Sequence, residues 1–369
     1  MTNTLLCSLL TISLVTGQVT FQNSAGTRLR VDNGTHGPPM EEVHYYGRIF
    51  TTYTRGSYDY TLGVVINETA EEPYPSAELN LPPNQLNTSW KGIPFGSGND
   101  SALISVQAIY MTSSNSQRPE TLWAIDTGRP TLVAISLANN SIYQIYTFPA
   151  SVHYPDSYLN DLRFDFKPNL SDTSGAGIAY LVDSSNEGRP GFIMVDLDTG
   201  ESWRRLTQDA SVLRGENDLS PDGERMYYSP LSTSTLYSIP TRNLRTRDSN
   251  PLAEIEAHAN VSSHGQRGGN ANGFEGDSNG LVYQLMPEQN AVYYFDPSDG
   301  LTHPFVRDPM IIWPDGASVA DDGYIYMNIN QLPYQPDWND EIDGRAYPGA
   351  VLRCKVPGDG TKITGLYDY

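Results

Sequence analysis

Residues 179–200 read AYLVDSSNEGRPGFIMVDLDTG and contain two strand-like runs with a polar turn between them. The runs cover residues 179–183 and 193–198. Both are short and rich in β-branched or aromatic residues, which favour extended structure. A polar pair, Asn160 and Asp161, opens this segment about twenty residues earlier. The order of these features, a polar opening followed by short apolar runs, is what decides the predicted fold.

The same order recurs along the whole chain. Polar residues open later segments at Asn217, Asn272 and Asp315, and two or more strand-like runs follow each of them. Two earlier units precede these four, one that opens at residues 105–108 and an N-terminal one at residues 43–82. The chain therefore holds six units of roughly fifty residues. Periods of this size are typical of propellers. We therefore predict an all-β, six-bladed β-propeller with mostly four-stranded blades around a central channel.

Composition agrees with one large β domain. The chain has 369 residues, with 32 Gly, 26 Pro and 24 Tyr, and no Pro- or Ser-rich linker divides it. Turn formers and aromatic residues together favour many short strands over helices. We expect residues 18–369 to form a single propeller domain.

The first 17 residues resemble a signal peptide. Residues 5–15 form an apolar run that is too short to span a bilayer. Cleavage there would remove Cys7 and leave Cys354 as an unpaired thiol. Repeated Asn-x-Ser/Thr sequons also predict glycosylation and a secretory or extracellular location. They begin at Asn33, Asn67, Asn87, Asn99, Asn139, Asn169 and Asn260.

A net charge of −20 argues against two classes of partner. Only 23 Lys and Arg residues are scattered along the chain, whereas binders of nucleic acid need clustered cations. We also expect no membrane span. The partner that we expect is a small hydrophobic or aromatic metabolite, and the oligomeric state stays open.

Several motifs resemble those of the major royal jelly/yellow family. They are residues 183–204 with the run Val-Asp-Leu-Asp at 195–198, residues 228–245, residues 264–281 and residues 312–315. The chain lacks the disulfide cysteines of insect members and is most similar to fungal secreted members. That resemblance implies a six-bladed propeller. It also suggests a secreted tailoring enzyme of secondary metabolism, of the hetero-Diels–Alderase type.

The polar residues that open the units should converge, because the first strand of each blade lines the channel of a propeller. These residues are Asn160, Asp161, Asn217, Asp218, Asn272 and Asp315. They could cap turns, contact a substrate or bind a metal. We favour no cofactor. Calcium is the possible ion, held by Asn160, Asp161, Asn217 and Asp218, because oxygen ligands suit a hard cation.

Further candidates lie in three other segments. His264 begins a Gly-rich stretch and, with Asp161 and Asp315, is assigned a catalytic role. Trp313 precedes Pro314 and could wall an apolar pocket. A long insertion in the last unit carries Tyr334 and Trp338, and insertions of that length are often lids. With Asn160, Asn217, Asp218 and Asn272, these three aromatic residues form the predicted substrate-binding set.

Three functions stay open on the sequence alone. The first is a pericyclase that joins a quinone methide to a terpene alkene, which needs oriented partners rather than a nucleophile. The second is a calcium-dependent, lactonase-like hydrolase. The third is a non-catalytic carrier of a hydrophobic or aromatic metabolite. Motifs of serine hydrolases, zinc proteases and P-loop enzymes are absent from the sequence.

Overall fold

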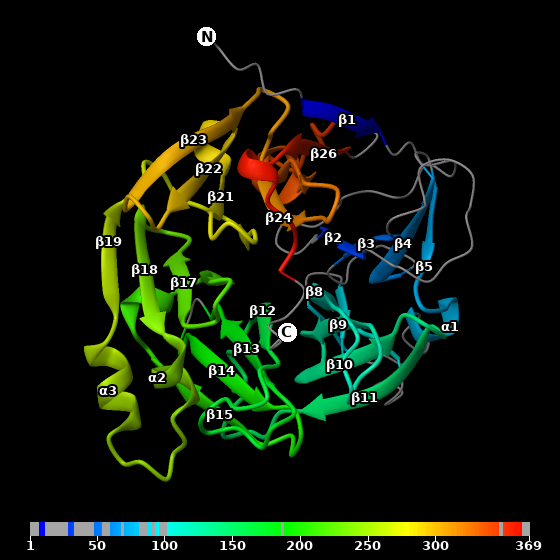
Figure 1. The fold of residues 1–369 in the computed structure, drawn as a ribbon. Coiled ribbons are helices and arrows are strands. Elements are labelled where there is room, and N and C mark those ends of the chain that lie inside the picture. Colours follow the sequence, from blue (N-terminus) through cyan, green and yellow to red (C-terminus); the bar gives the residue numbers. More distant parts are fainter. Residues whose placement is uncertain are drawn as a thin grey trace.

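Six four-stranded antiparallel sheets form a ring around a central channel in the computed structural model (Figure 1). The predicted all-β, six-bladed propeller is therefore confirmed. The structure describes residues 7–11, 29–32, 48–53, 60–67, 70–80, 88–90, 93–95, 102–185, 188–346 and 350–363. Within these residues, no helix is both long and apolar enough to cross a membrane.

Each blade runs from an inner strand at the channel to an outer strand at the rim. Contacts between inner strands close the ring in the order β2, β8, β12, β16, β20, β24 and back to β2. The blades, each from its inner strand outward, are β2 (Leu29–Asp32), β3 (Arg48–Thr52), β4 (Leu62–Asn67), β5 (Ala70–Pro73); β8 (Val106–Thr112), β9 (Thr121–Asp126), β10 (Thr131–Ser136), β11 (Ser141–Thr147); β12 (Leu159–Asp165), β13 (Ile178–Asp183), β14 (Gly191–Asp196), β15 (Ser202–Arg205); β16 (Gly215–Leu219), β17 (Arg225–Pro230), β18 (Thr235–Pro240), β19 (Ser262–Gln266); β20 (Phe274–Gly276), β21 (Val282–Met286), β22 (Ala291–Asp296), β23 (Leu301–Arg307); and β24 (Pro314–Val319), β25 (Tyr324–Ile329), β26 (Ala350–Lys355), β1 (Cys7–Thr11).

Apolar side chains pack between neighbouring blades rather than in one central core. Trp123 of β9 is fully buried, and its ring lies 4.6 Å from that of Phe164 in the next blade. Clusters of this kind occupy the other blade interfaces. Since both faces of a central blade strand are covered, strands such as β9 and β14 are buried along their whole length. The channel is then left to polar side chains.

The few helices lie between strands of the blades or between blades. The α-helices among the described residues are α1 (Ala77–Asn80), α2 (Thr241–Arg245) and α3 (Ala253–Ala259), with α2 and α3 joining β18 to β19. A two-stranded sheet of β6 (Thr88–Trp90) and β7 (Ile93–Phe95) lies between the first two blades in sequence.

The last blade is completed by the N-terminal strand β1, which pairs with β26 so that Cys7 lies opposite Cys354 in the register. This strand falls within the predicted signal peptide, and removal of residues 1–17 would take it away. That cleavage stays a prediction. Cys354 is disulfide-bonded in this structure, in which Cys7 is present. An unpaired Cys354 is expected only after cleavage, so it stays a prediction together with that cleavage.

Candidate functional site

A cavity of about 770 Å³ opens at one mouth of the central channel. Four inner-strand segments supply its floor, and the long insertion between β25 and β26 supplies part of its wall. The lining residues are Pro155, Asp156, Ser157, Tyr158, Asn160, Ser184, Arg214, Glu216, Leu231, Asn272, Trp313, Asp315, Leu332, Pro333 and Trp338. A volume of this size is typical of sites for small molecules.

Irregularities in three inner strands aim polar side chains at this end of the channel. The register of β8 against β9 shifts between Val106 and Ala108, which leaves Gln107 as the extra residue. A similar shift in β12 leaves Asn160 unpaired in the register, and one in β24 spans Asp315. Bulges bend a strand locally and re-aim its side chains, and they are common beside functional sites.

The floor residues are joined in two hydrogen-bonded groups. In the first, Tyr158 donates to Gln107 over 2.7 Å, and Gln107 donates to Asn160 over 3.0 Å. Asn160 in turn donates to a carboxylate oxygen of Glu216. In the second group, Asn272 donates to Asp315. Each floor carboxylate is thus oriented by the amide of a neighbouring blade.

The walls of the cavity are largely apolar. Trp313 precedes β24 and adopts a left-handed backbone conformation with φ of 55°. Leu332, Pro333 and Trp338 come from the insertion, and Leu231 lies across from them in the fourth blade. Trp338 is 64% exposed although it lines the cavity, so its ring has free surface available for a ligand.

The insertion is a compact loop closed at its base. The side chain of Gln331 donates to the Ala346 carbonyl and accepts from the Ala346 amide, both over 2.8 Å. The Gly344 amide also donates to the Tyr334 carbonyl over 2.9 Å. The base of the loop is anchored to the blade because the Gln331 amide donates to the Ile312 carbonyl over 3.2 Å.

Beneath the floor, a buried arginine crosses the channel. Arg163 of β12 donates to Asp161 over 2.9 Å, to Asp218 over 3.2 Å and to Glu275 over 3.3 Å. Its side chain is 1% exposed. Burial, opposed by Arg163 and assisted by Glu275, raises the pKa of Asp218 to about 7.

The four residues of the expected calcium set, Asn160, Asp161, Asn217 and Asp218, lie in three different surroundings. Asp161 and Asp218 contact the Arg163 guanidinium, which repels a cation from their midst. Asn217 lies between the channel-facing Glu216 and Asp218 on β16, so its side chain points away from the channel and donates to Met226 Sδ over 3.1 Å. Only Asn160 lines the cavity. The four side chains therefore do not form a common site, because alternate residues of a strand face opposite sides.

The catalytic assignment of His264 does not fit its position. His264 lies on β19, the outer strand of its blade, where it bonds to Ser238 over 2.8 Å and packs against Tyr227 and Phe295. Burial lowers its pKa. Tyr334 lies on the insertion but is 42% exposed and outside the lining set. Asp161 is turned from the cavity into the buried arginine cluster.

Of the predicted residues, Asn160, Asn272, Trp313, Asp315 and Trp338 meet at the cavity, while their roles stay predictions. The sequence reasoning missed Glu216, Gln107 and Tyr158. Glu216 could have been found by stepping back one residue from Asn217, since Glu216 and Asp218 share the channel face of β16. Gln107 could not have been found in this way, because the direction of its side chain depends on a bulge in β8.

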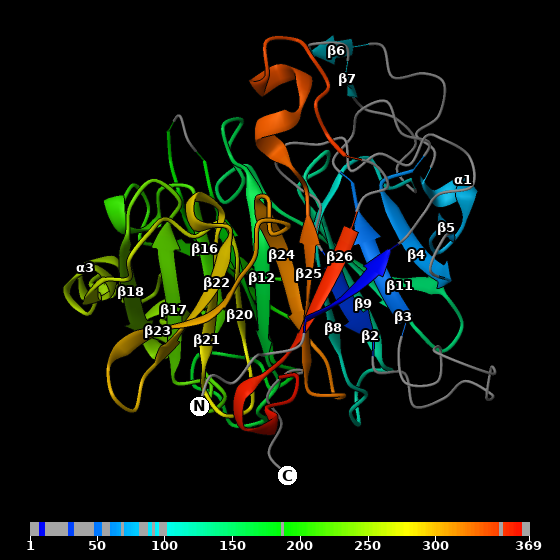
Figure 2. The same cartoon turned by 90° about the horizontal axis from the view of Figure 1, so that it is seen from above.

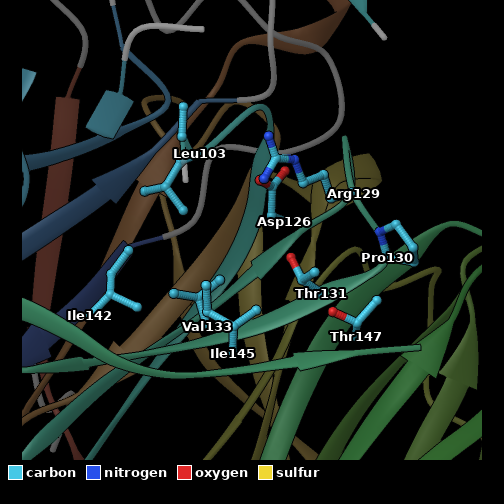
Figure 3. Close-up of a pocket in the computed structure, with 10 residues that line it drawn as sticks. Leu103, Asp126, Arg129, Pro130, Thr131, Val133, Ile142, Ile145 and Thr147 are labelled. Carbon is cyan, nitrogen blue, oxygen red and sulfur yellow. The ribbon is translucent and has the colours of Figure 1, made fainter. Parts of the chain in front are cut away.

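A second cavity, of about 410 Å³, lies on the second blade and away from the channel (Figure 3). Val133, Ile142 and Ile145 form its apolar side, and Asp126 and Arg129 lie at its other side. Asp126 is already satisfied, since it accepts from the backbone amides of Ile104, Ser105 and Gly128. The channel cavity is the better candidate site because its carboxylates face the space that a ligand would fill.

A family model described as major royal jelly protein matches residues 117–337. The chain belongs to the major royal jelly protein family. The matched region contains Asn160, Glu216, Asn272, Trp313 and Asp315. It ends one residue before Trp338, within the insertion.

Solved structures show the same fold at low sequence identity. A luciferin-regenerating enzyme is 11% identical with a TM-score of 0.55, and the alignment covers 94% of this chain and 95% of that one. Regucalcin from Agrobacterium tumefaciens, a calcium-binding protein, is 12% identical with a TM-score of 0.52, at 94% and 98% coverage. No curated protein sequence matches this chain.

Proposed function

We propose that this protein binds a small aromatic metabolite in the channel cavity and acts on it as a hetero-Diels–Alderase. The observation that supports the proposal is one cavity of about 770 Å³ with tryptophan walls and two oriented carboxylates in its floor. Sites for organic ligands combine apolar walls with a few convergent polar groups in the same way.

The reaction would need two partners held side by side. Trp313, Trp338 and Leu332 offer flat apolar surfaces against which an aromatic ring and an alkene could pack. Binding both partners in one orientation removes much of the entropic barrier to a bimolecular step. The apolar wall therefore supplies the positioning on which a cycloaddition depends.

The floor would generate the reactive partner. An ortho-hydroxybenzyl alcohol loses water when one carboxyl protonates the benzylic hydroxyl and the other carboxylate accepts the phenolic proton. The benzylic C–O bond breaks and a quinone methide forms, with no change of oxidation state. We assign these two roles to Asp315 and Glu216 jointly. Cycloaddition then forms one C–C and one C–O bond and consumes the alkene π bond.

The test supplies the purified protein with an ortho-hydroxybenzyl alcohol and a sesquiterpene alkene, followed by mass spectrometry of the products. We expect an adduct equal in mass to both partners minus water. Glu216→Gln should lower its rate about 100-fold, because general acid–base groups contribute that order of acceleration. Ile342→Ala is the control, since Ile342 is on the insertion between β25 and β26, is 65% exposed and lies outside the cavity lining.

Binding is measured separately, with the fluorescent aromatic alcohol 2-naphthol as probe. Binding of 2-naphthol without any adduct would identify a carrier rather than an enzyme. If neither binding nor adduct is found, the proposed function is wrong.

A calcium-dependent lactonase is the second candidate, favoured by the all-oxygen donor set of the floor. Glu216, Asp315, Asn160 and Asn272 are ligands of the kind that calcium prefers. A calcium ion held there would polarise a lactone carbonyl and activate water. The described residues contain no group of three or more His, Cys, Asp or Glu suited to a metal. Calcium content per chain, compared between the wild type and Asp315→Asn, tests this candidate.

We also propose that the protein enters the secretory pathway and is glycosylated. Asn139 and Asn169 are exposed in turns, whereas Asn260 is half-buried at the end of α3 and donates to the Glu256 carbonyl over 2.8 Å. The side chain of Asn67, and all of Asn33, Asn87 and Asn99, lie outside the described residues. A mass decrease on enzymatic removal of N-glycans from secreted protein would support the proposal, and an unchanged mass would contradict it.

A further inference from the structure

The C-terminal segment crosses the end of the channel opposite the cavity. Figure 1 shows the last described residues, in red, running toward the centre of the ring, and Figure 2 shows them on the face opposite the insertion between β25 and β26. Near its end, Thr361 and Lys362 pair with Ser278 and Asp277 of the fifth blade. The next residue, Ile363, accepts a hydrogen bond from Tyr110 of the second blade. The second and fifth blades lie across the ring from each other.

Lys362 projects from this segment into the buried centre of the channel. Its ammonium group donates to Ser318 over 2.7 Å and lies 3.8 Å from Glu275 Oε1. The side chain is fully buried. The ammonium nitrogen also lies 5.1 Å from the centre of the Tyr110 ring. Lys362 therefore contacts residues of three blades at once.

Glu275 connects Lys362 to the arginine cluster beneath the floor. One of its oxygens lies 3.3 Å from Arg163, and the other faces Lys362 and accepts from the Val319 amide over 3.2 Å. Three carboxylates, those of Asp161, Asp218 and Glu275, thus share two cations. A buried carboxylate is stable as an anion only when it is paired, so the second cation matters for the whole cluster.

The cluster lies directly under the residues that face the ligand cavity. Asp161 follows Asn160 on β12, and Asp218 lies two residues after Glu216 on β16. Ser318 lies three residues after Asp315 on β24. The strands that carry three of the floor residues are therefore tied together by Arg163 and Lys362 below that floor.

We propose that the segment at residues 360–363 closes the far end of the channel and that Lys362 is a positioning residue for the cavity floor. It acts through Glu275 and Arg163, which hold the inner strands in register across blades. The role in ligand binding rests on the proposed function, whereas the role in the charge cluster does not.

The charge argument makes the effect of Lys362→Met depend on pH. Without Lys362, the excess of carboxylates over cations in the cluster rises from one to two, so the folded variant must hold one more proton than the wild type or bear a further unpaired charge. The groups that face this position are Glu275, Asp218, Asp161, Arg163 and Asp321, whose carboxyl interacts electrostatically with Lys362, with Tyr110 and Ser318 beside them. Retaining a proton is easy at low pH and costs more as pH rises, so the variant loses stability toward high pH.

The test compares melting temperatures of Lys362→Met and the wild type at pH 5 and pH 8. We expect the variant to melt about 5 °C lower at pH 8 and less than about 2 °C lower at pH 5. Lys355→Met is the control, because Lys355 is 43% exposed and its ion pair is with the exposed Asp359 near the same segment. That control should shift by less than about 2 °C at both pH values.

Two further readouts decide between the charge role and simple packing. A decrease of equal size at both pH values would overturn the proposal, because lost packing has no pH dependence. In a Glu275→Gln background, the stability loss caused by Lys362→Met should lose most of its pH dependence, and full retention of that dependence would also overturn the proposal.

In Lys362→Met, the affinity for 2-naphthol should fall about 10-fold at pH 8 and less than about 2-fold at pH 5. If the wild type does not bind 2-naphthol, the proposed function fails, while the melting profile still decides the role of Lys362.

Discussion

The two ends of the central channel use acidic residues in opposite ways. At the cavity mouth, Glu216 and Asp315 accept hydrogen bonds from neutral amides and face a space walled by tryptophans. At the far end, Asp161, Asp218 and Glu275 are held by Arg163 and Lys362 and covered by the C-terminal segment. Acids paired with cations fix the blades, whereas acids held by amides stay available to a ligand.

Among these predictions, the largest effect on stability is expected from the removal of Arg163. Arg163→Met leaves three buried carboxylates with Lys362 alone, and breaking buried ion pairs from one side costs about 3–5 kcal/mol. We expect a large loss of unfolding free energy in a denaturant titration. Arg353→Met is the matched control at 38% side-chain exposure, with an expected loss below about 1 kcal/mol. Similar losses in both variants would contradict the division between the two ends.

A change at the cavity mouth should affect binding and leave stability alone. Trp338→Ala removes a lining ring that is 64% exposed, so the unfolding free energy should change by less than about 0.5 kcal/mol. Affinity for 2-naphthol should fall about 10-fold, because aromatic residues carry much of the energy of such contacts. Fluorescence titration measures this, beside the Ile342→Ala control. An unchanged affinity for Trp338→Ala would remove this ring from the ligand site.

The smallest effect is expected away from both ends, at His264. Its position on β19 places it outside the cavity, so His264→Ala should leave 2-naphthol affinity within about 2-fold. Loss of its hydrogen bond to Ser238 should cost about 1 kcal/mol of unfolding free energy. The same titrations report both quantities. A clear loss of affinity would restore His264 to the site and show that the cavity reaches the rim of the blade.

Much of the fold was readable from the sequence because it depends on local patterns. Short apolar runs and their turns define the strands, and their recurrence gives the number of blades. The polar residues that open inner strands were also found, since Asn160, Asn272 and Asp315 do meet at the channel mouth. These features are set by residues close in sequence, where periodicity and turn chemistry act.

The tertiary structure decided which of the polar residues on the inner strands face the ligand and which face each other. Bulges turn Gln107 and Asn160 into the channel, and the phase of β16 selects Glu216 instead of Asn217. Arg163 gathers acids from three blades, and Lys362 reaches them from the far end of the chain. The sequence sets the strands and their number, but one residue of register decides the direction of a side chain, and that register is fixed by packing between blades.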